Sequence, residues 1–375
     1  MKIIKLLYFV SEDWYFCSHR LPLAVAAKDA GYDIVVVTRV KAHGEHIREA
    51  GLRLIPFEMS RRAINPFSEV RVLWRLVGVI RRERPDIVHH VAMKPVLYGT
   101  LAARLCGVRH VVNALAGMGW ILASGTRLAR VMKWWVLSLF RVILPRTSVI
   151  VQNRDDAELI RSLGCQRVHL IRGAGVDVAA IKAISEPQGP CVVLLAARML
   201  WDKGVGEYVV ASRLLRARGA SVRMLLIGEP DDSNPASIPR EALRAWHDSG
   251  VVEWLGYRDD VPALLQRSHI VCLPSYYREG IPKFVLEGLA AGLPVVTTDT
   301  PGCRETVVEG VNGFLVAPRD ALALADALGK LVSDAELRKS MGCESRNLAM
   351  AEFSSERIIA ETLAVYGSLA KAHTI

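Results

Sequence analysis

The sequence lacks any apolar run long enough to cross a bilayer, since a membrane-spanning helix needs roughly 18–20 consecutive apolar residues. The amino-terminal stretch MKIIKLLYFVSEDW is apolar only briefly before acidic residues interrupt it. It lacks the long apolar region of a secretion signal and is more typical of a buried first strand. We therefore expect neither a membrane span nor a cleaved leader, whereas contact with a bilayer surface stays open.

Patterned cysteines are also missing. The seven cysteines are scattered without a CxxC pair, so they indicate neither a disulfide framework nor a zinc site. This distribution favours reduced thiols in a cytoplasmic protein, with Cys191 and Cys272 as small core residues of apolar strands. No internal repeat or low-complexity tract stands out, and no disordered tail is expected.

The length and charge of the chain leave several partners open. With 375 residues the chain is too long for one ordinary core, and two domains are expected. Lys and Arg outnumber Asp and Glu by 48 to 38, which gives a formal net charge of +10. A basic surface attracts nucleic acid, anionic lipid or phosphorylated small molecules, and charge alone does not choose among them. A soluble, Arg-rich enzyme is the plainest interpretation.

Short apolar runs alternate with helical patterns in the first half of the chain. A helix over 20–31 ends at a glycine, and a longer helix is predicted over 69–83. Alternation of this kind predicts βαβ units and a parallel sheet. The strands predicted for this half span residues 2–10, 32–38, 52–58, 85–91 and 110–115.

The same alternation pauses at IRGAGVDV (171–178) and then restarts. We predict an α/β fold of two Rossmann-like, doubly wound domains facing a central cleft, with ligands at the carboxyl ends of the strands. The predicted domains are 1–175 and 176–353. A last helix within 354–375 is open to packing on either domain, including back on the first. The strands predicted for the second half span 191–197, 222–228, 251–256, 269–274 and 293–298.

Two glutamates, Glu279 and Glu287, lie where an apolar strand meets a helix. Pro282 suits the first turn of that helix, whose first backbone N–H groups form an anion site to which Lys283 adds positive charge. Carboxylates accept hydrogen bonds from the paired hydroxyls of a sugar or a ribose. The combination favours a nucleotide sugar as ligand. The competing interpretation is a surface ion pair between Lys283 and Glu287, with Glu279 as a helix-capping acid.

A second pair of residues supports the first. In LLAARMLWDKGVG (194–206), Arg198 follows a strand and Lys203 opens the next helix. Two cations at the carboxyl end of a strand can both reach one diphosphate. Taken alone they are equally well two ordinary surface cations. Both motifs lie at the same edge of one predicted sheet, so each strengthens the other.

The segments LLAARMLWDKGV, EWLGYRDDV, PSYYREGIPKFVLEGLAAGLPVVTTDTPGCRETV and NGFLV resemble the retaining glycosyltransferases of family four, which have the GT-B fold. The E-x7-E signature of that family matches Glu279 and Glu287, and the resemblance covers nearly the whole chain. It implies that the catalytic Glu279 binds the hydroxyls of the donor sugar and that Glu287 binds the ribose. The residues implied for donor binding are Arg198, Lys203, Gly280, Ile281, Lys283, Phe284, Glu287, Tyr257 and Arg258.

Three segments of the first half, 11–24, 88–105 and 113–120, resemble a subgroup that acts on lipid-linked saccharides. Its members transfer a hexose or N-acetylhexosamine from a nucleotide sugar, expected here to be UDP-linked, to a polyprenyl-diphosphate-linked saccharide in bacterial glycan assembly. The first half then binds the acceptor, and nucleic acid is not an expected partner. A nucleotide-sugar epimerase of the same architecture is the alternative function. The acceptor candidates, each alternatively a structural or surface residue, are His19, Arg20, His90, Lys94 and Asn113.

The chain departs from the family pattern in two places. SEDWYFCSHR stands where many members have a Gly-Gly loop, and NALAGMG lacks the histidine that many members have there. The departures fit a mechanism in which the leaving diphosphate itself takes the acceptor proton. No D-x-D motif occurs, and Arg198, Lys203 and the helix N-terminus can neutralise the leaving group. We therefore expect neither a metal ion nor another cofactor.

Residues 127–146, RLARVMKWWVLSLFRVILPR, combine two tryptophans with five basic residues. A helix of this kind can lie in an anionic bilayer surface, with tryptophan near the headgroups and arginine on the lipid phosphates. This predicts a peripheral enzyme at the cytoplasmic, inner face of the plasma membrane. The alternative is a core helix whose long basic side chains extend into solvent.

Overall fold

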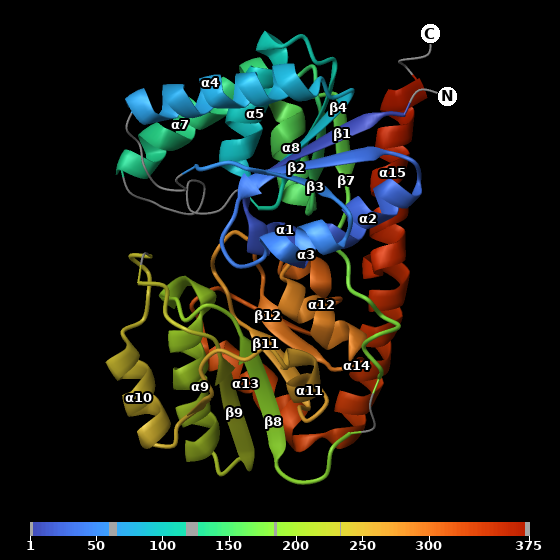
Figure 1. The fold of residues 1–375 in the computed structure, drawn as a ribbon. Helices are drawn as coiled ribbons and strands as arrows, with labels where there is room; N and C mark the ends of the chain where they lie inside the picture. Colours follow the sequence, from blue (N-terminus) through green and yellow to red (C-terminus); the bar gives the residue numbers. More distant parts are fainter. Residues whose placement is uncertain (1–2, 60–65, 118–126, 184–185, 233, 372–375) are drawn as a thin grey trace. The chain divides into compact units, whose positions relative to one another are not determined.

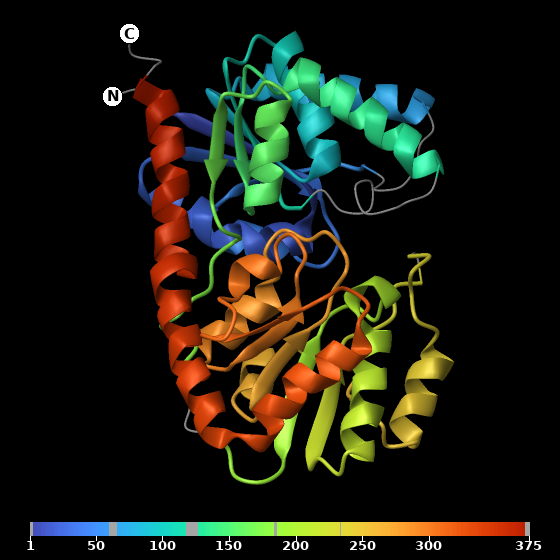
Figure 2. The same ribbon diagram turned by 180° about the vertical axis from the view of Figure 1, so that it is seen from behind.

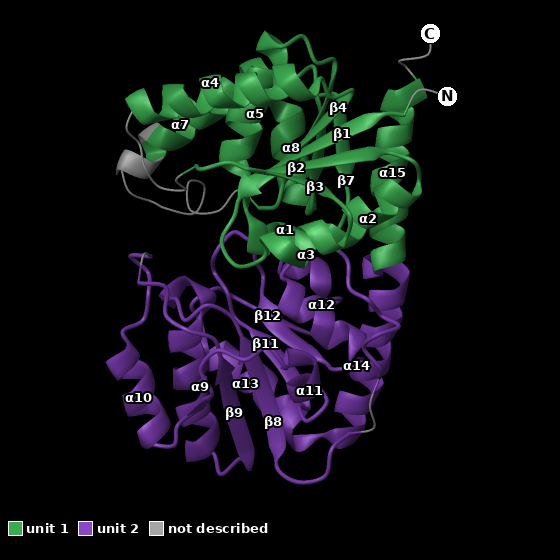
Figure 3. Cartoon of the chain, viewed as in Figure 1, with its two compact units in different colours: residues 1–174, 355–375 green, residues 175–354 purple. Residues whose placement is uncertain are grey.

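The computed structural model describes residues 3–59, 66–117, 127–183, 186–232 and 234–371 (Figure 1). The chain divides into two compact units, one formed by residues 1–174 with 355–375 and the other by residues 175–354 (Figure 3). Each unit has a parallel sheet with helices on both faces. This is the α/β, Rossmann-like architecture that the alternating sequence pattern predicts.

Unit 1, residues 1–174 and 355–375, has a seven-stranded sheet in the order β3-β2-β1-β4-β5-β6-β7, and its pairs are parallel. Its strands are β1 (Lys5–Glu12), β2 (Asp33–Arg39), β3 (Arg53–Pro56), β4 (Ile87–Val91), β5 (His110–Leu115), β6 (Ser148–Val151) and β7 (Arg167–Leu170). Its helices are α1 (Asp13–His19), α2 (Leu21–Asp29), α3 (Gly44–Glu49), α4 (Pro66–Glu83), α5 (Met93–Leu105), α7 (Arg127–Ile143), α8 (Arg154–Ser162) and α15 (Ser355–Lys371).

Strand β1 shows why an uninterrupted apolar run suits this sheet. Leu6, Tyr8 and Val10 point to the face covered by α2 and α15, whereas Leu7 and Phe9 point to the face covered by α4 and α5. Side chains alternate along a strand, so a strand covered on both faces is apolar at every position. Helix α7 packs on α5, and α4 and α7 lie on the same side of the sheet as α5 in both views (Figures 1 and 2).

Helix α15 joins unit 1 through a buried polar cluster as well as through apolar contacts. The hydroxyl of Tyr366 lies 3.0 Å from that of Tyr8 and 2.5 Å from Nδ1 of His89 on β4, and all three residues are fully buried. Burial, together with the nearby charge of Arg20, lowers the pKa of His89 well below its usual value, so the ring is neutral. The Tyr366 hydroxyl therefore fixes the position of α15 against β1 and β4.

Replacing Tyr366 by Phe tests this cluster. The change leaves His89 Nδ1 and the Tyr8 hydroxyl each short of a buried partner, so we expect a loss of about 1–3 kcal/mol in the free energy of unfolding. Urea denaturation measures the loss. Tyr257→Phe is the matched control, because Tyr257 is 75% exposed and its hydroxyl is not part of a buried cluster. Equal stabilities of the two variants would contradict the assignment.

Unit 2, residues 175–354, has a six-stranded sheet in the order β10-β9-β8-β11-β12-β13, with parallel pairs. Its strands are β8 (Cys191–Ala196), β9 (Val222–Ile227), β10 (Glu253–Trp254), β11 (Ile270–Leu273), β12 (Val295–Thr298) and β13 (Gly313–Val316). Its α-helices are α9 (Val205–Ala217), α10 (Arg240–Asp248), α11 (Val261–Leu265), α12 (Lys283–Ala290), α13 (Ala321–Ser333) and α14 (Ala335–Leu348). The short turns η1 (Trp201–Lys203) and η2 (Arg304–Thr306) are 3₁₀ helices, and η3 (Ala349–Phe353) is a π-helix.

Two neighbouring strands in the middle of the unit 2 sheet, β8 and β11, lead to the loops that contain the predicted site. Strand β11 has four residues and is fully buried between β8 and β12. Its carboxyl end leads through the loop 274–282 to α12, and the carboxyl end of β8 leads to η1. Both loops therefore leave the same sheet edge from neighbouring strands. None of the described helices is both long and apolar enough to span a bilayer.

Candidate functional site

The residues predicted to bind a nucleotide sugar lie in loops at the carboxyl end of the unit 2 sheet and in helix α12, which follows one of these loops. Because the strand order is β10-β9-β8-β11-β12, the loops that follow these strands form a row along that edge in the same order. Residues 257–258 follow β10, residues 198–203 follow β8 and residues 279–283 follow β11. Ligands of open parallel sheets bind along this edge.

Arg198 and Lys203 each lie beside a carboxylate. Arg198 is half exposed after β8, and its Nη1 lies 2.8 Å from Oδ2 of Asp231. Lys203 ends η1, and its Nζ lies 2.7 Å from Oε1 of Glu279, with both side chains nearly nine-tenths buried. The ammonium also lies 5.6 Å from the centre of the Tyr277 ring. The lysine of one predicted motif thus contacts the first glutamate of the other.

Two glycines allow the loops to approach this closely. Gly204 has φ 76°, and a Cβ there would lie 2.0 Å from the carbonyl oxygen of Pro274. Gly302, after β12, has φ 86°, and a Cβ there would lie 1.5 Å from the carbonyl oxygen of Gly280. Both positions combine a left-handed backbone with direct backbone contact, so only glycine fits. The loop from Pro274 to Gly280 is therefore in close backbone contact with the segment after β8 at one end and with the segment after β12 at the other.

The backbone of Asp202 joins the two loops further. Its carbonyl oxygen accepts hydrogen bonds from the N–H groups of Tyr276 and Tyr277, both at 3.0 Å, and from the Ser275 hydroxyl at 3.2 Å. Burial raises the pKa of the Asp202 carboxyl, whereas Lys203 and Arg198 oppose the shift. This acid adds a second carboxylate to the surroundings of Lys203.

Helix α12 begins at the site with Pro282 as its N-cap. Ile281 and Phe284 are 9% exposed and belong to the core, so their backbone rather than their side chains can contact a ligand. Lys283 Nζ lies 3.8 Å from Oε1 of Glu287. Burial raises the pKa of Glu287, and Lys283 opposes that shift. The Glu287 side chain is 19% exposed and that of Lys283 is 38% exposed, so the glutamate is the more buried partner of this ion pair.

Tyr257 and Arg258 lie at the far end of the row, beyond β9. Tyr257 is 75% exposed, and its backbone N–H donates to Oε1 of Glu229 at 3.3 Å. The guanidinium of Arg258 makes two hydrogen bonds to Asp260, at 2.7 and 2.5 Å. An exposed aromatic ring at this place is suited to stacking on a planar ligand group.

The acids beside these cations were missed in the sequence. Asp231 and Glu229 follow β9 in the segment GEPDD, directly after an apolar strand, and Asp202 lies between the two predicted cations. The available signal was the position of acidic residues at strand ends, which also marked Glu279. The contact of Asp231 with Arg198 could not be inferred, because the two residues are 33 positions apart in sequence.

His90 and Asn113, two of the predicted acceptor residues, bind each other inside unit 1. His90 Nδ1 lies 2.9 Å from Oδ1 of Asn113, which also accepts from Thr100 at 3.0 Å, and Asn113 donates to Thr147 at 3.1 Å. Both residues are fully buried, and burial lowers the pKa of His90 to about 4. Their placement differs from the direct acceptor contact that the resemblance implies, since neither side chain reaches the surface.

The other three predicted acceptor residues lie at different depths in unit 1. His19 stacks on Tyr15 with ring centres 4.2 Å apart. Arg20 is 4% exposed, between α1 and α2, and its charge acts on Tyr8 and His89. Lys94 at the start of α5 bonds Glu69 of α4 at 3.0 Å. Of the five predicted acceptor residues, His90 and Asn113 contact each other through a direct hydrogen bond.

Five charged residues of unit 2, named in the next sentence and called the donor cluster below, are suited to an anionic ligand that also has hydroxyl groups. Arg198, Lys203 and Lys283 supply positive charge, and Glu279 and Glu287 supply hydrogen-bond acceptors within the same row. Among the described residues, no group of three His, Cys, Asp or Glu side chains is arranged to bind a metal ion.

Family models match both halves of the chain. Residues 178–348 match the family described as glycosyl transferases group 1, and residues 5–153 match glycosyl transferase 4-like. The chain belongs to the group 1 glycosyltransferases. The matches span both sheets, and the group 1 model includes the row of loops that contains Arg198, Lys203, Glu279 and Glu287.

Several characterised proteins resemble this glycosyltransferase over most of its length. An N,N'-diacetylbacillosaminyl-diphospho-undecaprenol α-1,3-N-acetylgalactosaminyltransferase of Campylobacter jejuni is 28% identical, covering 91% of this chain and 92% of that protein. A UDP-Gal:α-D-GlcNAc-diphosphoundecaprenol α-1,3-galactosyltransferase of Escherichia coli is 23% identical over 76% of both. The crystal structure of Anabaena HepE with UDP and glucose has a TM-score of 0.78, with 17% identity over 97% of this chain and 100% of that chain. This structural likeness shows the GT-B fold.

Glu287→Gln tests the buried carboxylate. Because folding raises its pKa, the folded protein binds the proton more tightly than the unfolded chain, and this term favours folding below the unfolded pKa and is lost as pH rises through the folded pKa. The glutamine does not titrate. We therefore expect the stability of the variant relative to wild type to rise between about pH 4 and about pH 7.

Thermal melts at the two pH values measure this difference. Glu241→Gln, at an exposed position of α10, is the control and should show no such trend. A relative stability of Glu287→Gln that falls over the same interval would contradict the assigned pKa direction.

Proposed function

We propose that this enzyme is a retaining, metal-independent transferase that moves a hexose or N-acetylhexosamine from a UDP-sugar to a polyprenyl-diphosphate-linked saccharide in bacterial glycan assembly. The observation that supports it best is the contact between Lys203 and Glu279, which brings a cation for phosphate and a carboxylate for sugar hydroxyls to one point of the sheet edge. The names of the two bacterial relatives support the acceptor class.

The donor would bind by exchanging partners with the acids already present. Its diphosphate would take Arg198 from Asp231 and share Lys203 with Glu279, so neither cation would be left without an oxygen acceptor. The backbone of Gly280, Ile281 and Lys283, with Phe284 behind it, would contact phosphate and sugar at the start of α12. Glu279 would then accept from the sugar hydroxyls, Glu287 from the ribose, and Tyr257 and Arg258 would lie at the base.

The reaction that we propose does not require a side chain to act as the general base. As the bond between the sugar and the diphosphate breaks, negative charge grows on the leaving oxygen, and Arg198 and Lys203 stabilise that charge. The leaving oxygen accepts the proton of the incoming acceptor hydroxyl on the same face of the sugar, so the configuration at the anomeric carbon is retained. Glu279 orients the sugar for this attack.

Unit 1 would supply the acceptor side. We propose that His19, Arg20 and Lys94 lie nearest to the acceptor, and that His90 and Asn113 position β4 and β5 from within. Arg20 is buried beside neutral groups, namely the Tyr8 hydroxyl and the uncharged His89 ring. A buried guanidinium among neutral partners is suited to a phosphate of the acceptor.

A membrane surface would present the lipid-linked acceptor, and two helices of unit 1 suit it. On α7, Trp134 and Trp135 are 62% and 64% exposed, and Arg130 and Arg141 are exposed near them. On α4, which packs on α5 as α7 does, Val70 and Trp74 are exposed at i,i+4 spacing. Exposed tryptophans beside cations are typical of helices that lie in anionic bilayers. We propose peripheral attachment at the cytoplasmic face, with α4 as a second contact absent from the sequence-based prediction.

Variants of the donor cluster test the reaction. We expect Arg198→Ala and Lys203→Ala to lose about 100-fold in kcat/KM and to weaken UDP binding, because each removes a charge that stabilises the leaving group. Glu279→Ala should lose turnover most. Transfer from UDP-N-acetylhexosamine to a polyprenyl-diphosphate saccharide measures turnover, and calorimetry measures UDP affinity.

The matched control is Arg223→Ala, because Arg223 forms an exposed ion pair with Glu253 on the strands themselves. It should leave both measurements unchanged. Near-normal turnover of Glu279→Ala would refute the site assignment. Conversion of the UDP-sugar in the absence of any acceptor would favour the epimerase alternative instead.

Vesicle sedimentation tests the membrane surface. Replacing Trp134 and Trp135 by Ser and Arg130 by Gln removes exposed apolar area and charge, so binding to anionic vesicles should weaken by about tenfold. Leu322→Ser, at an exposed apolar position of α13 in unit 2, serves as control. If the triple variant sediments with vesicles as wild type does, α7 is not the contact surface.

A further inference from the structure

A cavity of about 510 Å³ lies in unit 2 at the sheet edge opposite to the donor cluster. Ser268 and His269 precede β11, and Gly292 to Pro294 precede β12, so the cavity lies at the amino ends of these parallel strands. Helix α14 forms its outer wall. The volume lies in the range of small-molecule sites and greatly exceeds the space of one water molecule.

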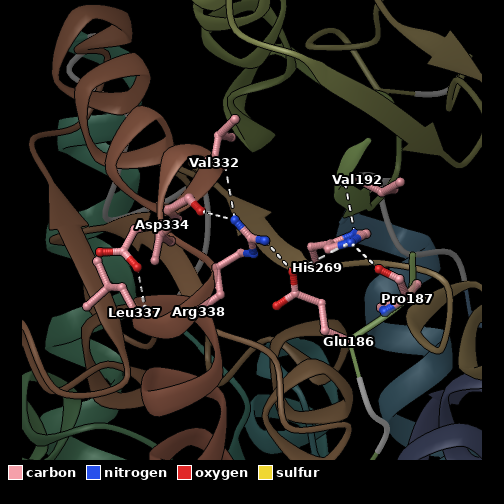
Figure 4. Close-up of polar contacts among 9 residues, drawn as sticks. Glu186, Pro187, Val192, His269, Val332, Asp334, Leu337 and Arg338 are labelled. Carbon is pink, nitrogen blue, oxygen red and sulfur yellow. Dashed lines mark hydrogen bonds and ion pairs between the residues drawn. The ribbon is translucent and has the colours of Figure 1, made fainter. Parts of the chain in front are cut away.

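Positive charge is concentrated in this cavity. The cavity is lined by three cationic side chains, Arg338, Lys339 and Arg346, and by one carboxylate, Glu186. Three positive charges and one negative charge give the lining a net charge of +2. Burial lowers the pKa of His269, whose ring accepts from the Val192 N–H and lies 3.0 Å from the carbonyl oxygen of Pro187 (Figure 4). The histidine is therefore neutral and fixed.

Arg346 and Arg338 differ in the charge of the groups that accept their hydrogen bonds. Arg346 donates to the carbonyl oxygens of Val178 and Ile181, at 2.6 and 2.5 Å, and to that of Ala290 at the end of α12. These acceptors are neutral, so the charge of Arg346 is not cancelled. Arg338 pairs with Glu186 and caps the end of α13 through Leu331 and Val332 (Figure 4).

Arg338 keeps one polar atom unsatisfied. The residue is 8% exposed, and within the described part of the chain its Nε makes no hydrogen bond. An unsatisfied buried donor costs free energy, which an acceptor within its reach would recover. Leu293, Pro294 and Gly292 give the same cavity an apolar lining on the strand side.

We propose that this cavity is a second ligand site, distinct from the donor cluster, which binds a small organic anion that has a phosphate or carboxylate group and an apolar body. The anionic group would lie among Arg338, Lys339 and Arg346, and the apolar part would contact Leu293 and Pro294. A neutral molecule of the same shape would leave the net positive charge of the cavity without an anionic partner.

Cys343 provides a direct measurement of occupancy. It lines the cavity one helical turn after Lys339, and it alone among the seven cysteines is classed as exposed. Labelling of the full chain with N-ethylmaleimide, followed by peptide mass spectrometry, gives the rate at this thiol. Phenyl phosphate is the anionic probe and benzyl alcohol its uncharged counterpart, at matched ionic strength.

Phenyl phosphate at millimolar concentration should slow labelling of Cys343 by about fivefold, and benzyl alcohol should not. Lys339→Gln, at an exposed position that should not disturb folding, should reduce the protection to less than about twofold. Lys371→Gln removes the same charge from α15 and should leave the protection intact. Equal protection by both probes, protection by neither, or an equal effect of the two lysine variants would overturn the proposal.

Discussion

The contact between Lys203 and Glu279 requires two loops of unit 2 to lie close together, and several backbone contacts hold them there. The loops leave neighbouring parallel strands, β8 and β11, at the same edge of the sheet. Asp202 accepts three hydrogen bonds from the second loop, and Gly302 supports that loop from β12 without any side chain between. A cation and a carboxylate that touch with little exposure are strongly coupled, so a shift of either loop would change both.

The same constraint explains why the acids lie among the cations. A cluster of Arg198, Lys203 and Lys283 alone would repel itself, and burial would raise the cost. Asp231, Glu279 and Glu287 offset this, so the cluster keeps its geometry without a ligand. In the reaction that we propose, a diphosphate would replace one set of oxygen acceptors by another, and the guanidinium and ammonium groups already lie beside such acceptors.

Much of the fold could be predicted because strands covered on both faces are apolar at every position, as β1 is. Strands β6, β7 and β13 were not predicted as strands, although β3, β11 and β12, which have the same length, were. Helix α1 was also missed, because SEDWYFCSH mixes acids and aromatics without helical periodicity. The row of site loops could be predicted from residue types at strand ends, whereas the Arg198–Asp231 pair depends on packing between separate loops.

The buried pair His90–Asn113 shows that residues singled out by a family resemblance can lie inside the sheet. Both residues lie in apolar strands, and a polar side chain in such a strand resembles a functional residue in sequence. Gly99 of α5 lies so close to His90 that a Cβ there would meet the ring at 2.3 Å, so the histidine fills space that the helix leaves for it. Its Nδ1 is hydrogen-bonded to Asn113, whereas its buried Nε2 has no hydrogen-bond partner among the described residues.

Polar residues of this kind fix the register of neighbouring strands, which apolar contacts alone leave less specific. The Tyr8–Tyr366–His89 cluster does the same for α15 on the other face of the sheet, because His89 and His90 are adjacent on β4 and point to opposite faces. One strand thus connects the carboxyl-terminal helix with β5 and α5. The two histidines therefore explain how unit 1 maintains a fixed frame.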